Sequence, residues 1–184
     1  MGIERLEKPL PKPTTEDYIN ARLLEALTEA YLAVRFLNDG LVRDAAGKAF
    51  QAWRALLASL LRLELDKLLQ VVKTEEEKKW LVSKAIPRIP SSKMKALSQM
   101  LEEIGHSGVL AWTTVALGLH DYQYNGPNPD MALSKYRNRE EAAIDIRYLI
   151  NELIKRVEGL RTRVRWSSEL EDALNGLKKA TGLA

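Results

Sequence analysis

The chain has 184 residues, and its 28 lysines and arginines outnumber its 25 aspartates and glutamates. This length suits one domain that buries its own core. The chain has no cysteine and two histidines, which excludes disulfides and thiolate metal sites and argues against a histidine-rich one. We therefore expect no metal and no cofactor. The net charge of +3 permits an acidic partner without requiring one.

A membrane-spanning segment is not expected, because no stretch reaches the roughly 18 consecutive apolar residues that such a helix needs. The longest apolar stretch, VLAWTTVALGL from Val109 to Leu119, is shorter and includes two threonines. The N-terminal MGIERLEKPLPKP lacks the apolar core of a signal peptide. We expect a cytoplasmic protein that does not contact a membrane.

Helical periodicity runs through almost the whole chain, and the sustained alternation that marks strands is missing. Residues 1–13 are rich in proline and predict an extended arm, and residues 14–184 predict a single helical domain. Two apolar stripes separated by Gly40 predict a tight antiparallel hairpin, with Gly40 in a left-handed conformation after the first helix. The stripes consist of Leu23, Leu27, Ala30, Val34 and Leu37, and of Ala45, Ala49, Ala52, Leu56, Leu60 and Leu63.

Start and stop signals define the other helices. Thr14, Thr74 and Asn138 are the expected N-caps, since each stands three residues before an acidic residue. The predicted fold is all-α, an antiparallel up-and-down bundle of four main helices with additional short helices. The expected segments after Gly40 are 41–72, a short helix from Thr74 to the prolines at 87 and 90, 91–104, 107–120, 138–164 and a short helix from Ser168.

Motifs with a defined chemistry are scarce. The phosphate-binding glycine loops and the H-E-x-x-H zinc motif are both missing from the sequence. The segment from Lys135 to Trp166 carries nine lysines or arginines against five acidic residues. These cations could contact phosphate, or they could form a solvated face with partners such as Glu141 and Asp145. We favour the solvated face, because the net charge is small.

The stretch ALGLHDYQYNGPNPD, residues 116–130, closes an apolar helix with polar and aromatic side chains. One interpretation places His120 at the helix end, where the C-terminal dipole favours its charged form and free carbonyls accept its N–H. A second gives His120, Asp121, Tyr122 and Tyr124 a role in binding. In a third, His120 is a catalytic residue. We favour the first interpretation, because helix ends routinely need such partners.

The segment EAYLAVRFLNDGLVRDAAGKAFQAWRALLASLL resembles the helical hairpin of archaeal PaREP-type proteins, within the wider HEPN superfamily of helical bundles. A late L-H-x-x-x-Y element is similar too, with Leu119, His120 and Tyr124 in its positions. The resemblance covers roughly residues 16–160. The hairpin residues that carry it are Ala33, Phe36, Leu37, Gly40, Lys48, Phe50 and Trp53.

The resemblance implies a helical bundle, usually dimeric, in an archaeal cytoplasm. It also implies a metal-independent ribonuclease activity, in which an arginine four to six residues before a histidine stabilises the reacting phosphate. This chain departs from that motif, because no lysine or arginine occurs between Ala96 and Leu119. Lys48 or Arg54 could take the place of the arginine in space. The resemblance further implies a nucleotidyltransferase as a partner.

These observations lead to one main hypothesis and two alternatives. The main hypothesis is a non-enzymatic, homo-oligomeric helical bundle, a dimer, that binds a ligand or a partner. Its expected interface segments are FQAW and VLAWTTV, and its expected binding residues are His120, Asp121, Tyr122, Tyr124, Lys48 and Arg54. The first alternative is a protein that binds or processes RNA or nucleotides, with His120 as the candidate catalytic residue. The second is a partner of a nucleotidyltransferase that adenylylates a tyrosine of HDYQY.

Overall fold

The structure is a computed structural model that describes residues 3–182, apart from the side chain of Arg5. Residues 1–2 of the expected arm and 183–184 of the expected domain lie outside the described residues. Every regular element in the described part is helical, which confirms the all-α class for that part. No helix within these described residues has both the length and the apolar character needed to cross a membrane.

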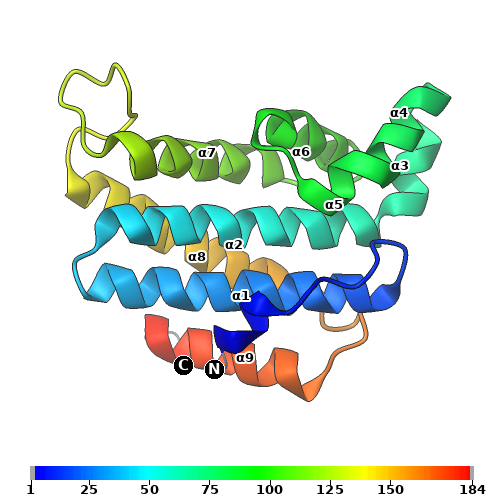
Figure 1. Ribbon diagram of the computed structural model, residues 1–184, viewed down its shortest axis with the longest axis horizontal. Helices are drawn as coiled ribbons and strands as arrows, with labels where there is room; N and C mark the ends of the chain where they lie inside the picture. Colours follow the sequence, from blue (N-terminus) through cyan, green and yellow to red (C-terminus); the bar gives the residue numbers. More distant parts are fainter. Residues whose placement is uncertain (1–2, 183–184) are drawn as a thin grey trace.

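Long helices form the body of the molecule, and shorter ones gather at one end (Figure 1). The long helices are α1 (Glu16–Asn38), α2 (Val42–Leu63), α7 (Val109–Asn125), α8 (Arg139–Gly159) and α9 (Ser168–Thr181). The short ones are α3 (Leu65–Val71), α4 (Glu75–Trp80), α5 (Ile86–Arg88) and α6 (Met94–Glu103). Two 3-10 turns, Ile3–Glu7 and Ser91–Lys93, and a π-helical turn, Leu81–Ala85, complete the described elements.

The α1–α2 hairpin forms as predicted. Gly40 has a φ of 76°, and the amide of Leu41 donates to the carbonyl of Phe36 at 2.8 Å. This positive φ favours glycine, which has no Cβ to strain the turn. The small residues of the α2 stripe, Ala45, Ala49 and Ala52, are fully buried. They allow α1 to approach α2 closely, as ridges-into-grooves packing requires.

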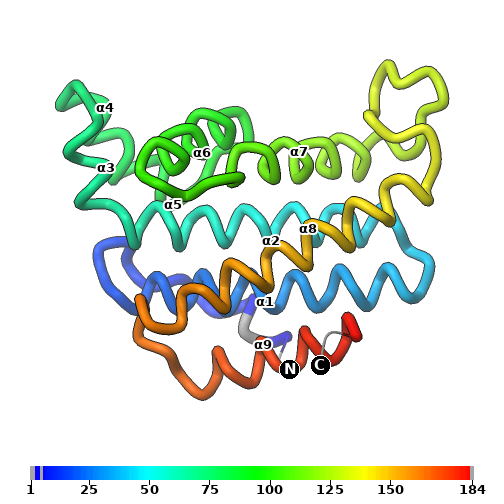
Figure 2. Tube along the Cα trace, turned by 180° about the vertical axis from the view of Figure 1, so that it is seen from behind, coloured from blue at the N-terminus to red at the C-terminus, as the bar shows by residue number. Residues whose placement is uncertain are grey.

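The other long helices are arranged around this hairpin. Helix α7 runs beside α2, α8 crosses the hairpin obliquely, and α9 lies along α1 (Figures 1 and 2). The predicted regular up-and-down packing of four main helices is not confirmed. Helix α8 crosses the hairpin obliquely and so departs from that packing. Phe50 and Trp53 on α2 are buried inside this arrangement, so the FQAW segment is core and is not available as an interface.

The predicted caps are correct at two of the three helix starts. The side chain of Thr74 accepts from the amide of Glu77 at 3.1 Å, and that of Asn138 accepts from the amide of Glu141 at 2.9 Å. The prediction for Thr14 is wrong, because Thr15 is the N-cap residue of α1. The Thr15 hydroxyl donates to the carbonyl of Lys12 instead of accepting from the helix.

The predicted single helix over residues 41–72 is wrong. The chain breaks at Glu64, which has φ −96° and ψ 12°, and this break separates α2 from α3. The Glu64 side chain is only 2% exposed and holds partners from distant parts of the chain. This buried carboxylate takes the place of an apolar side chain, so the regular apolar stripe of α2 ends at Glu64.

The predicted helix end at His120 is also wrong. Helix α7 continues to Asn125 and ends at Gly126, which has a φ of 68° and donates to the carbonyl of Tyr122 at 2.7 Å. His120 therefore lies within the helix, where the carbonyls are already bonded. The following loop folds back on α7, because the Asn125 amide donates to the carbonyls of Asp121 and Leu133.

Candidate functional site

His120 packs on an aromatic side chain of the neighbouring helix. Its ring stacks on Phe50 of α2, with 4.0 Å between the centroids and 21° between the planes. One turn further along α7, Tyr124 meets the imidazole edge-on at 5.2 Å. Phe50 is buried, whereas 67% of Tyr124 is exposed. The three rings thus lead from the core of the hairpin to the surface.

The environment of the His120 imidazole favours its neutral form. Burial lowers its pKa below the ordinary value for histidine, Asp121 opposes that shift, and the positive charge of Arg54 adds to it. Its Nδ1 atom is buried and has no hydrogen-bond partner among the described residues. The expectation of a charged histidine bonded to free helix-end carbonyls is therefore wrong, because those carbonyls lie a turn further on.

Arg54 lies on α2 one turn after Phe50. Its guanidinium carbon is 5.9 Å from the centroid of the Phe50 ring, which also stacks with His120. No hydrogen bond or ion pair ties Arg54 to another residue in the described part of the chain. Burial lowers the pKa of Arg54, but an arginine stays protonated in proteins. The face beside His120 therefore carries a cation whose hydrogen-bond donors are available.

The other charges on this face are neutralised in pairs. Lys48 lies 2.9 Å from Glu29, and Arg22 lies 2.7 Å from Glu25. Burial raises the pKa of Glu29, and the bond from Lys48 opposes that shift. Both carboxylates also attract Arg54 through space. With the two pairs balanced, Arg54 is an unpaired cation on this face, and the exposed Asp121 adds a negative charge next to His120.

The structure does not bring together all the residues that the sequence analysis predicts as binding residues. Tyr122 is buried and turns to Tyr136, with 5.5 Å between the ring centroids. Asp121 is exposed, and its contribution is electrostatic. Lys48 is engaged by Glu29, which sequence reasoning missed. The candidate site is thus His120, Tyr124, Phe50 and Arg54.

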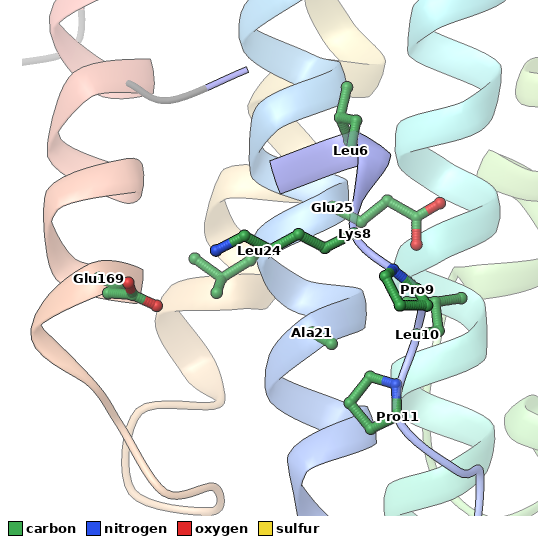
Figure 3. Close-up of a pocket in the computed structure, with 9 residues that line it drawn as sticks. All are labelled: Leu6, Lys8, Pro9, Leu10, Pro11, Ala21, Leu24, Glu25 and Glu169. Carbon is green, nitrogen blue, oxygen red and sulfur yellow. The ribbon is translucent and has the colours of Figure 1, made fainter. Parts of the chain in front are cut away.

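A pocket of about 410 Å³ has none of the four candidate-site residues in its lining. It lies between the N-terminal arm and α1, with Glu169 of α9 at its edge (Figure 3). Lys8 reaches across the pocket toward α9, whereas Glu25 points toward α2 (Figure 3). Glu25 therefore belongs both to this pocket and to the charged face that contains Arg54.

A second polar cluster forms at the break between α2 and α3. The Glu64 carboxylate lies 2.9 Å from Nε2 of His106 and 2.8 Å from Nζ of Lys67, and it also accepts a short bond from Arg163. Burial favours a raised pKa, but the bonds from Lys67, Arg163 and His106 outweigh it and hold the pKa of Glu64 at about 2. This cluster joins distant segments and serves stability.

In the basic segment from Lys135 to Trp166 several arginines have partners within the chain, but the expected carboxylates bond other groups: Glu141 accepts from the Arg137 amide, and Asp145 accepts from the Tyr136 hydroxyl. Arg139 donates to the carbonyl of Gly40, and Arg156 donates to that of Ser107. Arg161 pairs with Glu171 at 2.9 Å. Lys135, Arg147, Lys155 and Arg165 are exposed and form no ion pair with a described residue, so the segment holds free cations as well as engaged ones.

The fold and the site together define an all-helical protein whose central hairpin carries a stacked aromatic and cationic face. The model of the archaeal PaREP1/PaREP8 family matches residues 21–147, which is well over half of the chain and includes that face. The chain belongs to this family. No curated protein and no solved structure matches the chain.

Proposed function

We propose that this protein is a homo-oligomeric, HEPN-type helical module of the archaeal cytoplasm that binds a nucleotide unit, free or within RNA. The binding face is formed by Phe50, Arg54, His120 and Tyr124. The observation that supports this proposal is the free guanidinium of Arg54 beside the neutral imidazole of His120.

Each side chain has a part in recognising such a ligand. A guanidinium binds phosphate oxygens through two parallel N–H donors, which makes an uncommitted arginine well suited to this group. An exposed aromatic ring such as Tyr124 can stack on a base, which contributes about 1–3 kcal/mol per base in single-stranded complexes. The imidazole of His120 can bond either group through Nε2, since its other ring nitrogen, Nδ1, is buried.

The test is the binding of AMP and of a fluorescently labelled single-stranded RNA, measured by titration at fixed salt. Arg54→Gln should weaken binding at least tenfold, because a charge-assisted bond contributes about 1.5–3 kcal/mol. The matched control is Arg147→Gln, an exposed arginine of α8 that no described residue engages. Equal binding by the Arg54→Gln variant and the parent would contradict the proposal.

A second candidate function is metal-independent cleavage of RNA. This candidate is supported by the packing of α2 against α7, which brings Arg54 close enough to His120 to influence its pKa. His120 would take the proton of a ribose 2′-hydroxyl, whose oxygen attacks the adjacent phosphorus. The 5′-oxygen would leave with a proton, and a 2′,3′-cyclic phosphate would remain. The lowered pKa of His120 favours the neutral form that a base needs.

This candidate predicts cyclic-phosphate ends after incubation of the protein with RNA in the presence of a metal chelator. His120→Ala should abolish them with an unchanged melting temperature. A parent protein that forms no such product would rule out cleavage while leaving the binding proposal intact.

A nucleotidyltransferase partner would act on Tyr124 and not on Tyr122. Tyr124 is 67% exposed, whereas Tyr122 is 1% exposed. The phenol oxygen would attack the α-phosphorus of a nucleoside triphosphate, and pyrophosphate would leave. Co-expression with such an enzyme should increase the mass of the parent protein but not that of Tyr124→Phe. An unchanged mass of the parent would count against this role.

A further inference from the structure

A groove lies at the end of the molecule where the short helices gather. Its volume is about 630 Å³, and it is formed by α3, α4 and α6. Helix α4 projects outward beside it, beyond the long helices (Figures 1 and 2). Trp80 and Met100 are half-buried in its lining, and Val71 at its edge is 45% exposed. A projecting helix next to an apolar groove can both insert into a partner and receive one.

The charges around this groove are of both signs and are not paired within the chain. Two cations and two carboxylates line the groove, Lys73, Lys93, Glu77 and Glu103. Glu76 precedes Glu77 in α4, and Lys95 lies in the first turn of α6. All six are exposed, and no described residue forms an ion pair with them. A nucleic acid would require an excess of positive charge at its binding surface. A surface with equal charges of opposite sign instead complements itself.

Self-complementarity is the requirement for a two-fold symmetric interface, because the same patch of each subunit meets its copy. An aromatic anchor at the centre of such a patch, with polar residues around it, is the arrangement that stable interfaces favour. Trp80 is the aromatic residue of this groove, and it lines the groove together with Glu77 and Lys93. By contrast, VLAWTTV, which we expected at the interface, presents no large and fully exposed apolar side chain.

We propose that two copies of this chain form a dimer through the groove beside Trp80. In this dimer the acidic beginning of α4 in each copy lies against Lys93 and Lys95 of the other, and each Trp80 is covered. This inference rests on the homo-oligomeric state proposed above and assigns it a surface. The interface lies apart from Arg54 and His120, so ligand binding and self-association can be tested separately.

The experiment is native mass spectrometry of the full chain and of charge-reversed variants. The parent should be a dimer. Both Lys93→Glu/Lys95→Glu and Glu76→Lys/Glu77→Lys should be monomers, because like charges then face each other. Mixing these two variants should yield a heterodimer, since opposite charges meet again. The restored heterodimer also shows that neither variant has lost its fold.

The matched control is Lys135→Glu/Lys155→Glu, which reverses two exposed lysines elsewhere and should leave the dimer intact. A dimer that persists in Lys93→Glu/Lys95→Glu would overturn this surface and leave the homo-oligomeric state standing. A monomeric parent would overturn both. Neither result affects the binding measurement with Arg54→Gln.

Discussion

The Glu64 carboxylate binds side chains from three places in the sequence, Lys67, His106 and Arg163. A carboxylate buried in this way is stable only while its partners stay close, because an unpaired buried charge is costly. The Glu64 side chain thus holds three parts of the chain together. They are the break between α2 and α3, the α6–α7 connection and the segment after α8.

Replacing this carboxylate should weaken the fold. We expect Glu64→Gln to lower the free energy of unfolding by about 2–3 kcal/mol, toward the lower end for a broken buried pair because Lys67 and Arg163 can regain water. Urea unfolding followed by circular dichroism measures this change. Glu75→Gln is the control, since its exposed pair with Lys78 should contribute less than about 1 kcal/mol. Equal losses in the two variants would contradict the structural role of Glu64.

The sequence contains an indication of the role of Glu64, but that indication can be interpreted only with the structure. Leu56, Leu60, Glu64 and Leu68 are spaced four residues apart, so a carboxylate interrupts an apolar stripe. One of its partners, Arg163, stands 99 residues away, and no local rule could identify it. The position of Arg54 beside His120 was likewise named only as an option, because it depends on how two helices pack.

Helices α2, α6 and α7 are joined by a buried chain of hydrogen bonds. The indole N–H of Trp53 donates to the hydroxyl of Thr113 at 2.9 Å, and the hydroxyl of Ser98 lies 2.7 Å from the same oxygen. All three side chains are buried. Thr113 therefore holds a polar contact at the centre of an otherwise apolar junction.

Removing the Thr113 hydroxyl should leave the groups of Trp53 and Ser98 without a partner. We expect Thr113→Val to cost about 1–3 kcal/mol of unfolding free energy. Thr114→Val serves as control, because that threonine is exposed and bonds only its own helix at Leu110. Its effect should stay within about 0.5 kcal/mol. Comparison of the denaturation midpoints of Thr113→Val, Thr114→Val and the parent tests this prediction.

The end of α7 depends on a glycine in a left-handed conformation. Gly126→Ala should destabilise the protein by about 1–2 kcal/mol, because a Cβ is strained at a φ of 68°. Gly159→Ala should act in the opposite direction, since this helical glycine has open space around its Cβ position. Thermal unfolding of both variants measures the difference in sign, and a stabilised Gly126→Ala variant would contradict this account.

Local signals in the sequence were sufficient for some elements and not for others. The turn at Gly40 and the caps at Thr74 and Asn138 were predictable, because neighbouring residues determine them. The extension of α7 beyond His120 was not, because HDYQY carries polar residues that also suit a helix end. The interface expectation at FQAW failed for another reason: an aromatic segment of a helix buries itself in the core as readily as against a partner.

At the scale of the whole molecule, Glu64 makes stability depend on acidity. Its pKa is about 2 in the folded protein, against 4.5 as its ordinary value. A lowered pKa means that the stabilisation is complete above pH 4.5 and is lost as the pH falls toward 2. The contribution is up to about 3 kcal/mol. The melting temperature of the parent should therefore fall between these pH values more steeply than that of Glu64→Gln; parallel curves would refute the assignment.

The hydrogen bonds at the end of α7 also affect how fast the protein degrades chemically. An asparagine before a glycine ordinarily loses ammonia when the glycine amide nitrogen attacks its side-chain carbonyl. Here the amide of Gly126 donates to Tyr122, and the Asn125 side chain is tied to the carbonyls of Asp121 and Leu133. Neither the nucleophile nor the leaving group is free to move. The fold thus shields its own Asn-Gly bond from deamidation, a form of chemical durability that unfolding would remove.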